Sequence, residues 1–452
     1  MIEQLAAMPG YEAYKDSGVE WLGEIPAHWK SQKLKFNSEL RVSNVDKHSK
    51  KLELPVKLAN YVDVYKNNFI TDSIEFMEVT ANQEEIERFS IKIDDVLITK
   101  DSEDWLDIGV PALVKYQEKN LLCGYHLAII RSKYNTEGKF VFWALLAHYN
   151  RIQFSVKANG VTRFGISHGA IKNNWLALPP LPEQTAIAAF LDRKTAQIEQ
   201  AVAIKEQQIA LLKERKQILI QNAVTRGLDP NVPMRDSGVQ WIGEIPAHWN
   251  LKKLKYIVRF VSGGTPSKDK AEYWNGIIPW VSPKDMKRLN IDSSIDYITD
   301  TAVKNTNIRL LDVGTILIVV RGMILAKKVP VALSKSLLTI NQDMKGLIPS
   351  PDCLPEYLLY LLDGINGVLS TLLEESGHGT KTLPTEKLGL LPLGIPSKDD
   401  QSLIVTYIET QSAKIDQAIS IQQQQIDKLK EYKATLINSA VTGKIRVPEV
   451  AA

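Results

Sequence analysis

One stretch of fourteen residues occurs twice in this chain, and it constrains the architecture more than any other feature. DSGVEWLGEIPAHW, residues 16–29, returns as DSGVQWIGEIPAHW, residues 236–249, with twelve of the fourteen positions identical. A second stretch, residues 184–225, aligns without gaps on residues 401–442, and 19 of these 42 positions are identical. A repeat of this kind sets the architecture before any single element does. The sequence therefore predicts a tandem duplication.

Between the repeated stretches the two halves differ in sequence, but the expected elements follow the same order. Short apolar runs bounded by Gly, Pro or polar residues indicate three strands, a helical period follows, and a polar loop comes last. In the first half these are the strands 91–100, 110–114 and 125–132, the helix 140–149 and the loop 157–173. In the second half they are the strands 313–322, 329–333 and 341–347, the helix 356–365 and the loop 376–388. Each half is therefore predicted to be a mixed α/β domain.

The second repeated stretch has the three-four spacing of apolar residues that a coiled coil requires. A helix of 42 residues is about 60 Å long, which exceeds one face of a small domain, so we expect the two helices to pair with each other. Polar residues interrupt the pattern at Lys205, Lys216, Gln422 and Lys433. The predicted seam consists of Leu191, Ile198, Val202, Ile209, Leu212 and Leu219 in the first helix and Ile408, Ile415, Ile419, Ile426, Leu429 and Leu436 in the second.

The end of the chain completes a cyclic order of domains and helices. Residues 440–450 resemble residues 223–233, which lead directly into the second copy of the fourteen-residue motif. The predicted fold is therefore mixed α/β, with two diverged globular domains joined by two long helices that form an antiparallel coiled coil around an approximate twofold axis. The expected segments are a first globular domain with the first motif at 1–182, a central helix at 183–226, a second domain with the second motif at 227–399, and a C-terminal helix and tail at 400–452.

Composition excludes several classes of protein. The chain is 44% hydrophobic and 24% charged, with a net charge of +3, which is ordinary for a globular protein. Cys123 and Cys353 are too few for a disulfide framework. No apolar run approaches the roughly 20 residues of a membrane span, and the N-terminus lacks the pattern of a signal peptide. We therefore expect a cytoplasmic protein without membrane contact.

Catalytic signatures are missing from the sequence. It contains no phosphate-binding loop, no G-x-G-x-x-G, no G-x-S-x-G and no HExxH, and no spacing typical of metal ligands. His28 and His248 lie beside aromatic residues in the motif, where packing or hydrogen bonding is favoured over acid–base chemistry. Asp94, Asp95 and Lys100 resemble a nuclease cluster only faintly, and a strand entered through an acidic turn is the favoured interpretation. We expect no catalytic residue and no bound metal.

Taken together, these features resemble the specificity subunit of a bacterial type I restriction-modification enzyme, and the resemblance spans the whole length. It rests on the paired motifs, on the entry LPEQ at 181–184 into a long helix that ends in NAVTRGL, and on GGTPS with IPWVSPKDMK at 278–287. The second helix departs from the pattern, because IPSKDDQ stands at its entry and VTGK at its end.

The resemblance implies a non-catalytic subunit with two target-recognition domains, each of which reads one half of a bipartite site in double-stranded DNA. The helices would act as a spacer and as the docking surface for two modification (methyltransferase) subunits. S-adenosylmethionine is then expected on those modification subunits, and ATP and magnesium on two restriction (motor-nuclease) subunits. This chain itself is expected to bind no cofactor.

Side chains that donate hydrogen bonds to base edges and phosphates are the natural DNA contacts. A solvated surface residue is the alternative for any single candidate, so the prediction concerns the set. In the first domain the candidates are Lys157, Asn159, Thr162 and Arg163 in the polar loop, with Tyr65, Lys66 and Lys100 at strand edges. In the second domain they are Lys268, Lys284, Arg321, Lys327, Asn341, Gln342, Thr380 and Lys381.

Two questions remain open at the level of sequence. Trp21, Ile25, Pro26 and Trp29 of the motif either fasten each globular domain to the helices or dock a partner, and both roles can coexist. The whole chain has an alternative interpretation as a structural tether, in which a coiled coil holds two protein-binding domains and no nucleic acid takes part. A stand-alone nuclease or methyltransferase is disfavoured by the missing motifs.

Overall fold

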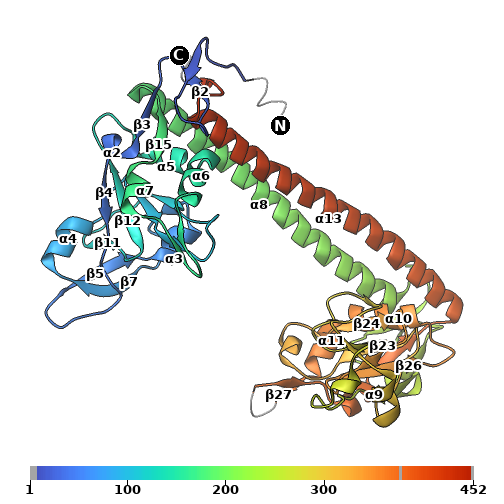
Figure 1. Cartoon of the computed structure of the whole chain (residues 1–452). Coiled ribbons are helices and arrows are strands. Elements are labelled where there is room, and N and C mark those ends of the chain that lie inside the picture. The colour runs from blue at the N-terminus through green and yellow to red at the C-terminus, as the bar shows by residue number, and fades with distance from the viewer. Residues whose placement is uncertain (1–7, 376–378, 449–452) are drawn as a thin grey trace. The chain divides into compact units, whose positions relative to one another are not determined.

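The computed structural model describes residues 8–375 and 379–448 (Figure 1). These residues form two compact units, each with its own core. Unit 1 draws on residues 1–205 and 424–452, and unit 2 on residues 206–423. Because both unit boundaries fall inside the long helices, each unit contains one α/β domain and one stretch of each helix.

The α/β domain of unit 1 is built on a five-stranded sheet in the order β4-β12-β8-β10-β6. All its neighbours are antiparallel except β10 and β6, and β8, whose residues VLIT are all buried, lies at its centre. A three-stranded sheet in the order β11-β5-β7 lies beside it. The strands of the two sheets are β4 Ser38–Val42, β5 Leu54–Ala59, β6 Phe69–Ile70, β7 Met77–Ala81, β8 Val96–Thr99, β10 Pro111–Val114, β11 Leu121–Cys123 and β12 Leu127–Ser132.

The α/β domain of unit 2 repeats this topology with different residues. Its five-stranded sheet has the order β19-β26-β23-β24-β21, again with a parallel pair only at the β24–β21 edge, and its three-stranded sheet has the order β22-β20-β25. The predicted duplication of a mixed α/β fold is therefore confirmed. The strands are β19 Val258–Ser262, β20 Trp274–Val281, β21 Asn290–Ile291, β22 Asp296–Ile298, β23 Ile316–Val319, β24 Val331–Ser334, β25 Thr339–Ile340 and β26 Met344–Pro349.

The turn before each central strand has the same backbone conformation in the two domains although its residues differ. Asp94 has φ 66° and donates its amide to Val114 O at 3.0 Å, and Gly314 has φ 90° and donates its amide to Ser334 O at 3.0 Å. Both positions need a left-handed backbone, which glycine adopts freely and aspartate tolerates. The neighbouring Asp95 is buried and pairs with Arg131 at 2.6 Å, so this carboxylate is structural.

Helices cover the sheets and complete each core. α5, Gly138–Leu146, packs on β10 and β8, and α10, Pro355–Gly364, packs on β24 and β23. The single helix predicted for the first half is therefore shorter than expected, because a second one, α6, begins after Ala147. The remaining helical elements are α2 Leu34–Asn37, α3 Tyr61–Lys66, α4 Gln83–Phe89, α6 His148–Ser155, α7 His168–Lys172, η1 Leu254–Tyr256, η2 Ala271–Tyr273, α9 Asp300–Asn305, η3 Met323–Ala326, α11 Asn366–Thr371 and α12 Thr385–Leu390.

Each copy of the repeated motif forms the same small hairpin at the entrance of its domain. β1 pairs with β2, and β16 pairs with β17 in the same register. In both copies the isoleucine of EIP and the final tryptophan are buried, whereas Trp21 is 42% exposed. The short strands here are β1 Tyr14–Asp16, β2 Glu24–Pro26, β3 Lys30–Lys33 with its partner β15 Trp175–Leu178, β16 Met234–Asp236, β17 Glu244–Pro246, and β18 Asn250–Lys253 with its partner β29 Pro392–Ile395.

The two long helices are α8, Leu181–Arg226 with 46 residues, and α13, Lys398–Val441 with 44 residues. In unit 1 they run antiparallel, because Glu199 pairs with Lys433 at 2.6 Å and Lys205 donates a hydrogen bond to Gln425 (Figure 1). In unit 2 Lys216 pairs with Asp416 at 2.7 Å. The predicted antiparallel helix pair is confirmed, and polar residues on its seam are bonded to the opposite helix.

Every predicted seam residue is withdrawn from solvent to some degree. The structure buries Leu191, Ile198, Ile209, Ile408, Ile426, Leu429 and Leu436 and half-buries Val202, Leu212, Leu219, Ile415 and Ile419. Among the described residues no helix combines the length and the apolar character that a membrane crossing needs.

Segments from far apart in the chain close unit 1. Arg446 donates its amide to Pro9 O at 2.7 Å, and the Tyr14 hydroxyl donates to Gly443 O at 3.1 Å. The segment after α13 therefore lies against the segment before β1, as the predicted cyclic order requires.

Candidate nucleic-acid interface

Both α/β domains bring the same three segments together at one edge. In unit 1, Lys100 after β8 donates its amide to His126 O at 2.9 Å and accepts from Ile166 N at 2.8 Å. In unit 2, Val320 after β23 donates to Asp343 O at 2.8 Å and accepts from Leu383 N at 2.8 Å. The three segments are the turn after the central strand, the residues before the last long strand and a hairpin. We call this arrangement the three-segment edge.

The hairpin is the part of this edge that the sequence described least well. The predicted polar loop 157–173 is wrong as a single loop, because it contains the β13–β14 hairpin and α7. β14 pairs with β9, the two-residue strand that follows the central strand, so the hairpin lies beside the turn after that strand. The strands concerned are β9 Asp101–Ser102, β13 Asn159–Gly160 and β14 Phe164–Gly165 in unit 1 and β27 Glu374–Glu375 and β28 Lys381–Thr382 in unit 2. Part of the second predicted loop, residues 376–378, lies outside the described residues.

An ion pair and an aromatic ring mark the edge in unit 1. His126 Nδ1 lies 2.5 Å from Asp101 Oδ2, and the half-exposed Tyr125 ring packs on His126 with centroids 4.1 Å apart. Lys100 Nζ lies 5.6 Å from the Tyr125 centroid, within cation–π distance. The segment therefore offers an imidazole, a phenol and an ammonium group within one small area.

A second cluster lies on α3 and the loop after β9. The rings of Tyr61 and Tyr65 stack with centroids 5.5 Å apart, and the Tyr65 hydroxyl donates to Asp107, which also pairs with Arg151 at 3.1 Å. The bond to Asp107 raises the pKa of Tyr65. Burial raises the pKa of Tyr61, while its bond to Ser102 and the positive charge of Arg163 act in the opposite direction. Arg163 therefore lies within electrostatic reach of this cluster.

The candidates of the first domain fall into three groups. Asn159, Thr162 and Arg163 are exposed on the hairpin, and Lys100 is half-buried at the end of β8, as a strand-edge residue should be. Lys157 follows α6 and is half-buried. The expectation that Tyr65 and Lys66 stand at strand edges is wrong, because both lie in α3.

In unit 2 four of the predicted candidates line one open pocket of about 580 Å³. These four are Lys268, Lys284, Asn341 and Gln342. Two tryptophans hold the glycine-containing loop that forms one wall, because Trp280 Nε1 donates to Gly264 O at 2.8 Å and Trp274 Nε1 donates to Ser267 O at 3.0 Å.

Within this pocket Asn341 and Gln342 have different roles. Asn341 is 6% exposed, donates its side-chain amide to Asp343 at 3.3 Å and accepts from the Asp343 backbone at 3.1 Å, so it shapes the turn before β26. Gln342 is exposed and accepts from the Thr265 hydroxyl, which leaves its amide N–H groups directed away from that bond. Gln342 is therefore the member of the pair that can donate to an external acceptor.

The remaining candidates of the second domain surround the same edge. Arg321 is exposed, and its backbone forms an isolated β-bridge with Thr382 of the hairpin. Gly322 donates its amide to Lys381 O at 3.1 Å. Thr380 and Lys381 are half-buried on the hairpin, and Lys327 is exposed at the end of η3.

Sequence reasoning missed several residues of the three-segment edge. They are Asp101, Tyr125 and His126 in unit 1 and Asp343 in unit 2, and the pocket in unit 2 adds Thr265 and Asp296. The signal for Tyr125 and His126 was available, because these residues precede β12 as Gln342 and Asp343 precede β26. A carboxylate in such a place can accept from the amino group of cytosine. No cluster of His, Cys, Asp or Glu suited to a metal ion occurs among the residues described.

Comparisons with known proteins agree on one family. A family model described as the type I restriction modification DNA specificity domain matches residues 42–212 and 246–431, which together exceed half of the chain. The specificity subunit of the type I restriction enzyme EcoR124I/EcoR124II of Escherichia coli is 39% identical over 159 residues, and this match covers 35% of the present chain and only 39% of that relative. The putative type I restriction enzyme MjaX specificity subunit of Methanocaldococcus jannaschii is 24% identical over 440 residues, covering 94% of this chain and 96% of the relative.

Solved structures share the fold. A chain from a structure of the type I R-M system superimposes with a TM-score of 0.70 at 16% identity, covering 92% of this chain and 98% of that one. The HsdS subunit of Thermoanaerobacter tengcongensis gives a TM-score of 0.54 at 16% identity, covering 93% and 98%. The mixed α/β fold with long helices is therefore that of these structures.

Proposed function

Because this chain belongs to the type I restriction modification DNA specificity family, with two matched regions, we propose that it is the DNA-reading subunit of a type I restriction-modification complex. In this role it recognises double-stranded DNA and performs no chemistry. Each α/β domain reads one half of a bipartite site.

The observation that carries this proposal is the three-segment edge. Backbone hydrogen bonds between matching positions hold the edge in the same conformation in both units, whereas the side chains it presents are different. A shared frame with different side chains is what two readers of unlike half-sites require, because hydrogen bonds to base edges carry sequence information.

The side chains at the two edges suit different bases and phosphates. Unit 1 offers Lys100, Arg163 and His126 at its edge. Unit 2 offers Arg321 and Gln342 at its edge, with Lys284 in the pocket that Gln342 also lines. Arginine can bind guanine through two hydrogen bonds, glutamine can bind adenine, and lysine neutralises phosphates. A net charge of +3 is compatible with this role, because DNA binding depends on local clusters of positive charge rather than on the net charge of the protein.

We assign the repeated elements to protein partners. The two motif copies and the long helices keep similar sequences while the domains diverge, and similar surfaces suit two equivalent modification subunits. Those subunits supply the methyltransferase activity and bind S-adenosylmethionine, and two restriction subunits bring ATP and magnesium. This chain contributes no cofactor and no catalytic residue.

Methylation mapping provides the direct test. The gene is expressed with its modification subunit in a host without other DNA methyltransferases, and the methylated bases are located across the genome. The proposal expects a single bipartite motif with an unread spacer, and no methylation when either subunit is omitted. Methylation without this chain, or a motif without a gap, would contradict the proposal.

A salt series separates this role from a protein-only tether. Phosphate contacts release counterions, so the logarithm of DNA affinity should fall linearly with the logarithm of salt concentration. The complex with modification subunits is titrated with duplex DNA that contains the mapped motif and with duplex that lacks it. Equal and weak binding of both duplexes at every salt concentration would favour the tether.

A further inference from the structure

The two copies of the repeated motif meet the first turns of the long helices in the same way, but only one of the resulting sites is filled. In unit 1 His28 Nε2 lies 2.9 Å from Glu183 of α8, and in unit 2 His248 Nε2 lies 3.3 Å from Asp400 of α13. Each pair has a buried tryptophan next to it, because Trp29 donates to Glu183 and Trp249 lines one pocket with His248 and Asp400. The two sites can therefore be compared as an internal pair.

In unit 1 a tyrosine fills this site. The Tyr11 hydroxyl donates to Glu183, and its ring centroid lies 5.6 Å from that of His28 and 5.7 Å from that of Trp29. Trp29 Nε1 also donates to Glu183 at 3.1 Å, and Glu183 is only 7% exposed. Burial and the bond to Glu183 raise the pKa of Tyr11, so the phenol stays protonated and donates to the carboxylate.

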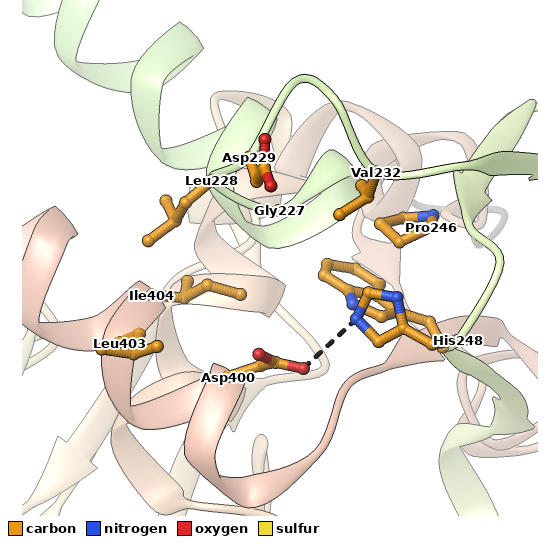
Figure 2. Close-up of a pocket in the computed structure, with 10 residues that line it drawn as sticks. Gly227, Leu228, Asp229, Val232, Pro246, His248, Asp400, Leu403 and Ile404 are labelled. Atoms are coloured by element: carbon orange, nitrogen blue, oxygen red, sulfur yellow. Dashed lines mark ion pairs between the residues drawn. The ribbon is translucent and has the colours of Figure 1, made fainter.

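In unit 2 the corresponding space is open. A pocket of about 150 Å³ lies between the segment after α8, the second motif and the first turn of α13, with Pro246, Trp249 and Ile404 in its walls (Figure 2). Figure 2 shows His248 and Asp400 facing each other at its side. The sequence explains the vacancy, because Asn231 stands at the motif spacing where unit 1 has Tyr11.

The open pocket leaves groups uncovered that unit 1 protects. The Asp400 side chain is 37% exposed, against 7% for Glu183, and Leu403 beside it is 62% exposed. Engineered cavities of about 150 Å³ bind a benzene ring. An apolar pocket of this size with a carboxylate at its side has the shape and the chemistry for a phenol ring.

The charges around the two sites also differ. In unit 1 the positive charge of Arg446 acts on Tyr11. In unit 2 the pocket lining contains a second carboxylate, Asp229, in addition to Asp400. The described residues that line the unit 2 pocket therefore include neither the phenol nor the guanidinium that unit 1 supplies from its own chain.

We propose that the unit 2 pocket is a docking site for a tyrosine side chain next to a lysine or arginine on a segment of a partner protein. The phenol hydroxyl donates to Asp400, the ring packs between Trp249, Pro246 and Ile404, and the basic residue lies near Asp229. This docking site is independent of the DNA-reading role, because its test needs neither DNA nor a modification subunit.

Three capped peptides test the site, namely Ala-Tyr-Lys, Ala-Phe-Lys and Ala-Tyr-Glu. The full chain is labelled with 5-fluorotryptophan, and fluorine resonances of Trp249 and Trp29 are followed during titration. Ala-Tyr-Lys should shift the Trp249 resonance and leave Trp29 unchanged, because Tyr11 occupies the unit 1 site. A hydrogen bond to a charged group is worth about 1.5–3 kcal/mol, so Ala-Phe-Lys should bind at least about tenfold more weakly. Ala-Tyr-Glu should also bind more weakly.

Two neighbouring variants sharpen the result. Asp400→Asn should remove most of the difference between the tyrosine and phenylalanine peptides, whereas Asp399→Asn, an equal loss of charge at an exposed neighbour outside the pocket, should preserve it. Tyr11→Ala should open the unit 1 site, so that the tyrosine peptide now shifts the Trp29 resonance as well.

Several results would overturn the proposal. They are an unshifted Trp249 resonance at saturating peptide, equal binding of the tyrosine and phenylalanine peptides, and equal effects of the two aspartate variants. A Trp249 resonance that moves with protein concentration alone would assign the pocket to a second copy of this chain and contradict the partner assignment. If Tyr11→Ala does not fold, the peptide series on the unaltered chain still decides.

Discussion

Arg163 and Arg321 lie on different segments of the three-segment edge in the two units. Arg163 is exposed on the β13–β14 hairpin. Arg321 is exposed in the turn after β23, where its backbone forms a β-bridge with the β27–β28 hairpin. Both therefore belong to the three-segment edge, each in its own unit.

Alanine at either arginine should affect one half-site only. A base-reading arginine contributes about 1–3 kcal/mol of discrimination, whereas an arginine that contacts phosphate weakens all sequences alike. Arg163→Ala and Arg321→Ala are compared by methylation mapping and by DNA titration at fixed salt. Equal relaxation of both half-sites by one variant would contradict the assignment of one domain to each half-site.

A half-buried carboxylate in unit 2, Asp363, gives a prediction about pH. Burial raises the pKa of Asp363, although the charges of Lys328 and Lys216 act against this shift. Because the pKa of Asp363 is raised in the folded state, folding favours the protonated carboxyl. The free energy of unfolding therefore falls as the pH rises from the pKa of the unfolded state through that of the folded state. Asp363→Asn should therefore raise the urea midpoint at pH 7, and this gain should shrink as the pH is lowered toward 4.5.

The exposed carboxylate Asp269 supplies the control for this measurement. Asp269→Asn should change the midpoint little, and by similar amounts at both pH values. A gain from Asp363→Asn that is the same at both pH values would show that the effect is not electrostatic.

The types of residue at the candidate interface were easier to predict than the directions in which their side chains point. The sequence named lysines, a glutamine and an asparagine as candidates in the second domain, and the structure brings Lys284, Gln342 and Asn341 to one pocket. It could not show that Asn341 turns inward to bond Asp343, because that depends on the turn before β26. It missed His126 because a lone histidine before a strand has no pattern until that strand is aligned with its counterpart.

The long helices are the elements that local sequence describes best. Apolar residues that recur every seven positions over many turns predict a paired helix and also which of its faces is buried. Both α8 and α13 have this pattern along their length. Only three strands were predicted for each domain, whereas its five-stranded and three-stranded sheets together contain eight; the three occur in the predicted order, and the hairpin beside β9 was predicted to be a loop. A strand of two residues is too short to show an alternation of apolar and polar residues, so it can be recognised only from the strand with which it pairs.

A charge in the helix seam should destabilise the pair. Leu212 is half-buried on the seam, and Leu211 next to it is 56% exposed. Leu212→Asp places a carboxylate where burial without a partner costs several kcal/mol at full burial, so we expect a loss of about 1–3 kcal/mol here. Leu211→Asp is the matched control and should change the unfolding free energy by less than about 0.5 kcal/mol.

Urea unfolding of both variants and their binding to modification subunits provide the measurements. Equal unfolding midpoints for Leu212→Asp and the unaltered chain would show that the seam assignment is wrong.

At the scale of the whole molecule, helix length is expected to set the spacer between the two half-sites. Repeating Ile198–Ile204 in α8 together with Ile426–Tyr432 in α13 adds one heptad to each helix and keeps the seam in phase. One heptad adds about 10 Å at 1.5 Å per residue, which corresponds to about three base pairs at 3.4 Å each. The methylated motif should keep both half-sites while its gap lengthens, by less than this if the DNA bends or twists.

Extension of α8 alone is the control for this prediction, because it leaves a heptad without a partner and should lower stability. A four-residue insertion breaks the phase of the seam and should be costlier for each ångström gained. An unchanged gap in an active variant with both heptads would mean that something other than these helices fixes the spacing.

The closure of unit 1 by residues that follow α13 has a consequence for biosynthesis. The core of unit 1 includes Leu436, Val441 and Val447, which are synthesised after all of unit 2, because unit 2 is one continuous stretch, residues 206–423. Unit 1 therefore lacks part of its core until the segment after residue 423 has been synthesised, and we expect unit 2 to fold first. Truncated nascent chains ending near residue 423 should show a protease-resistant unit 2 and a protease-sensitive unit 1, and only addition of the last segment should protect both. An exposed, unfinished first domain is the state in which a chaperone would meet this protein.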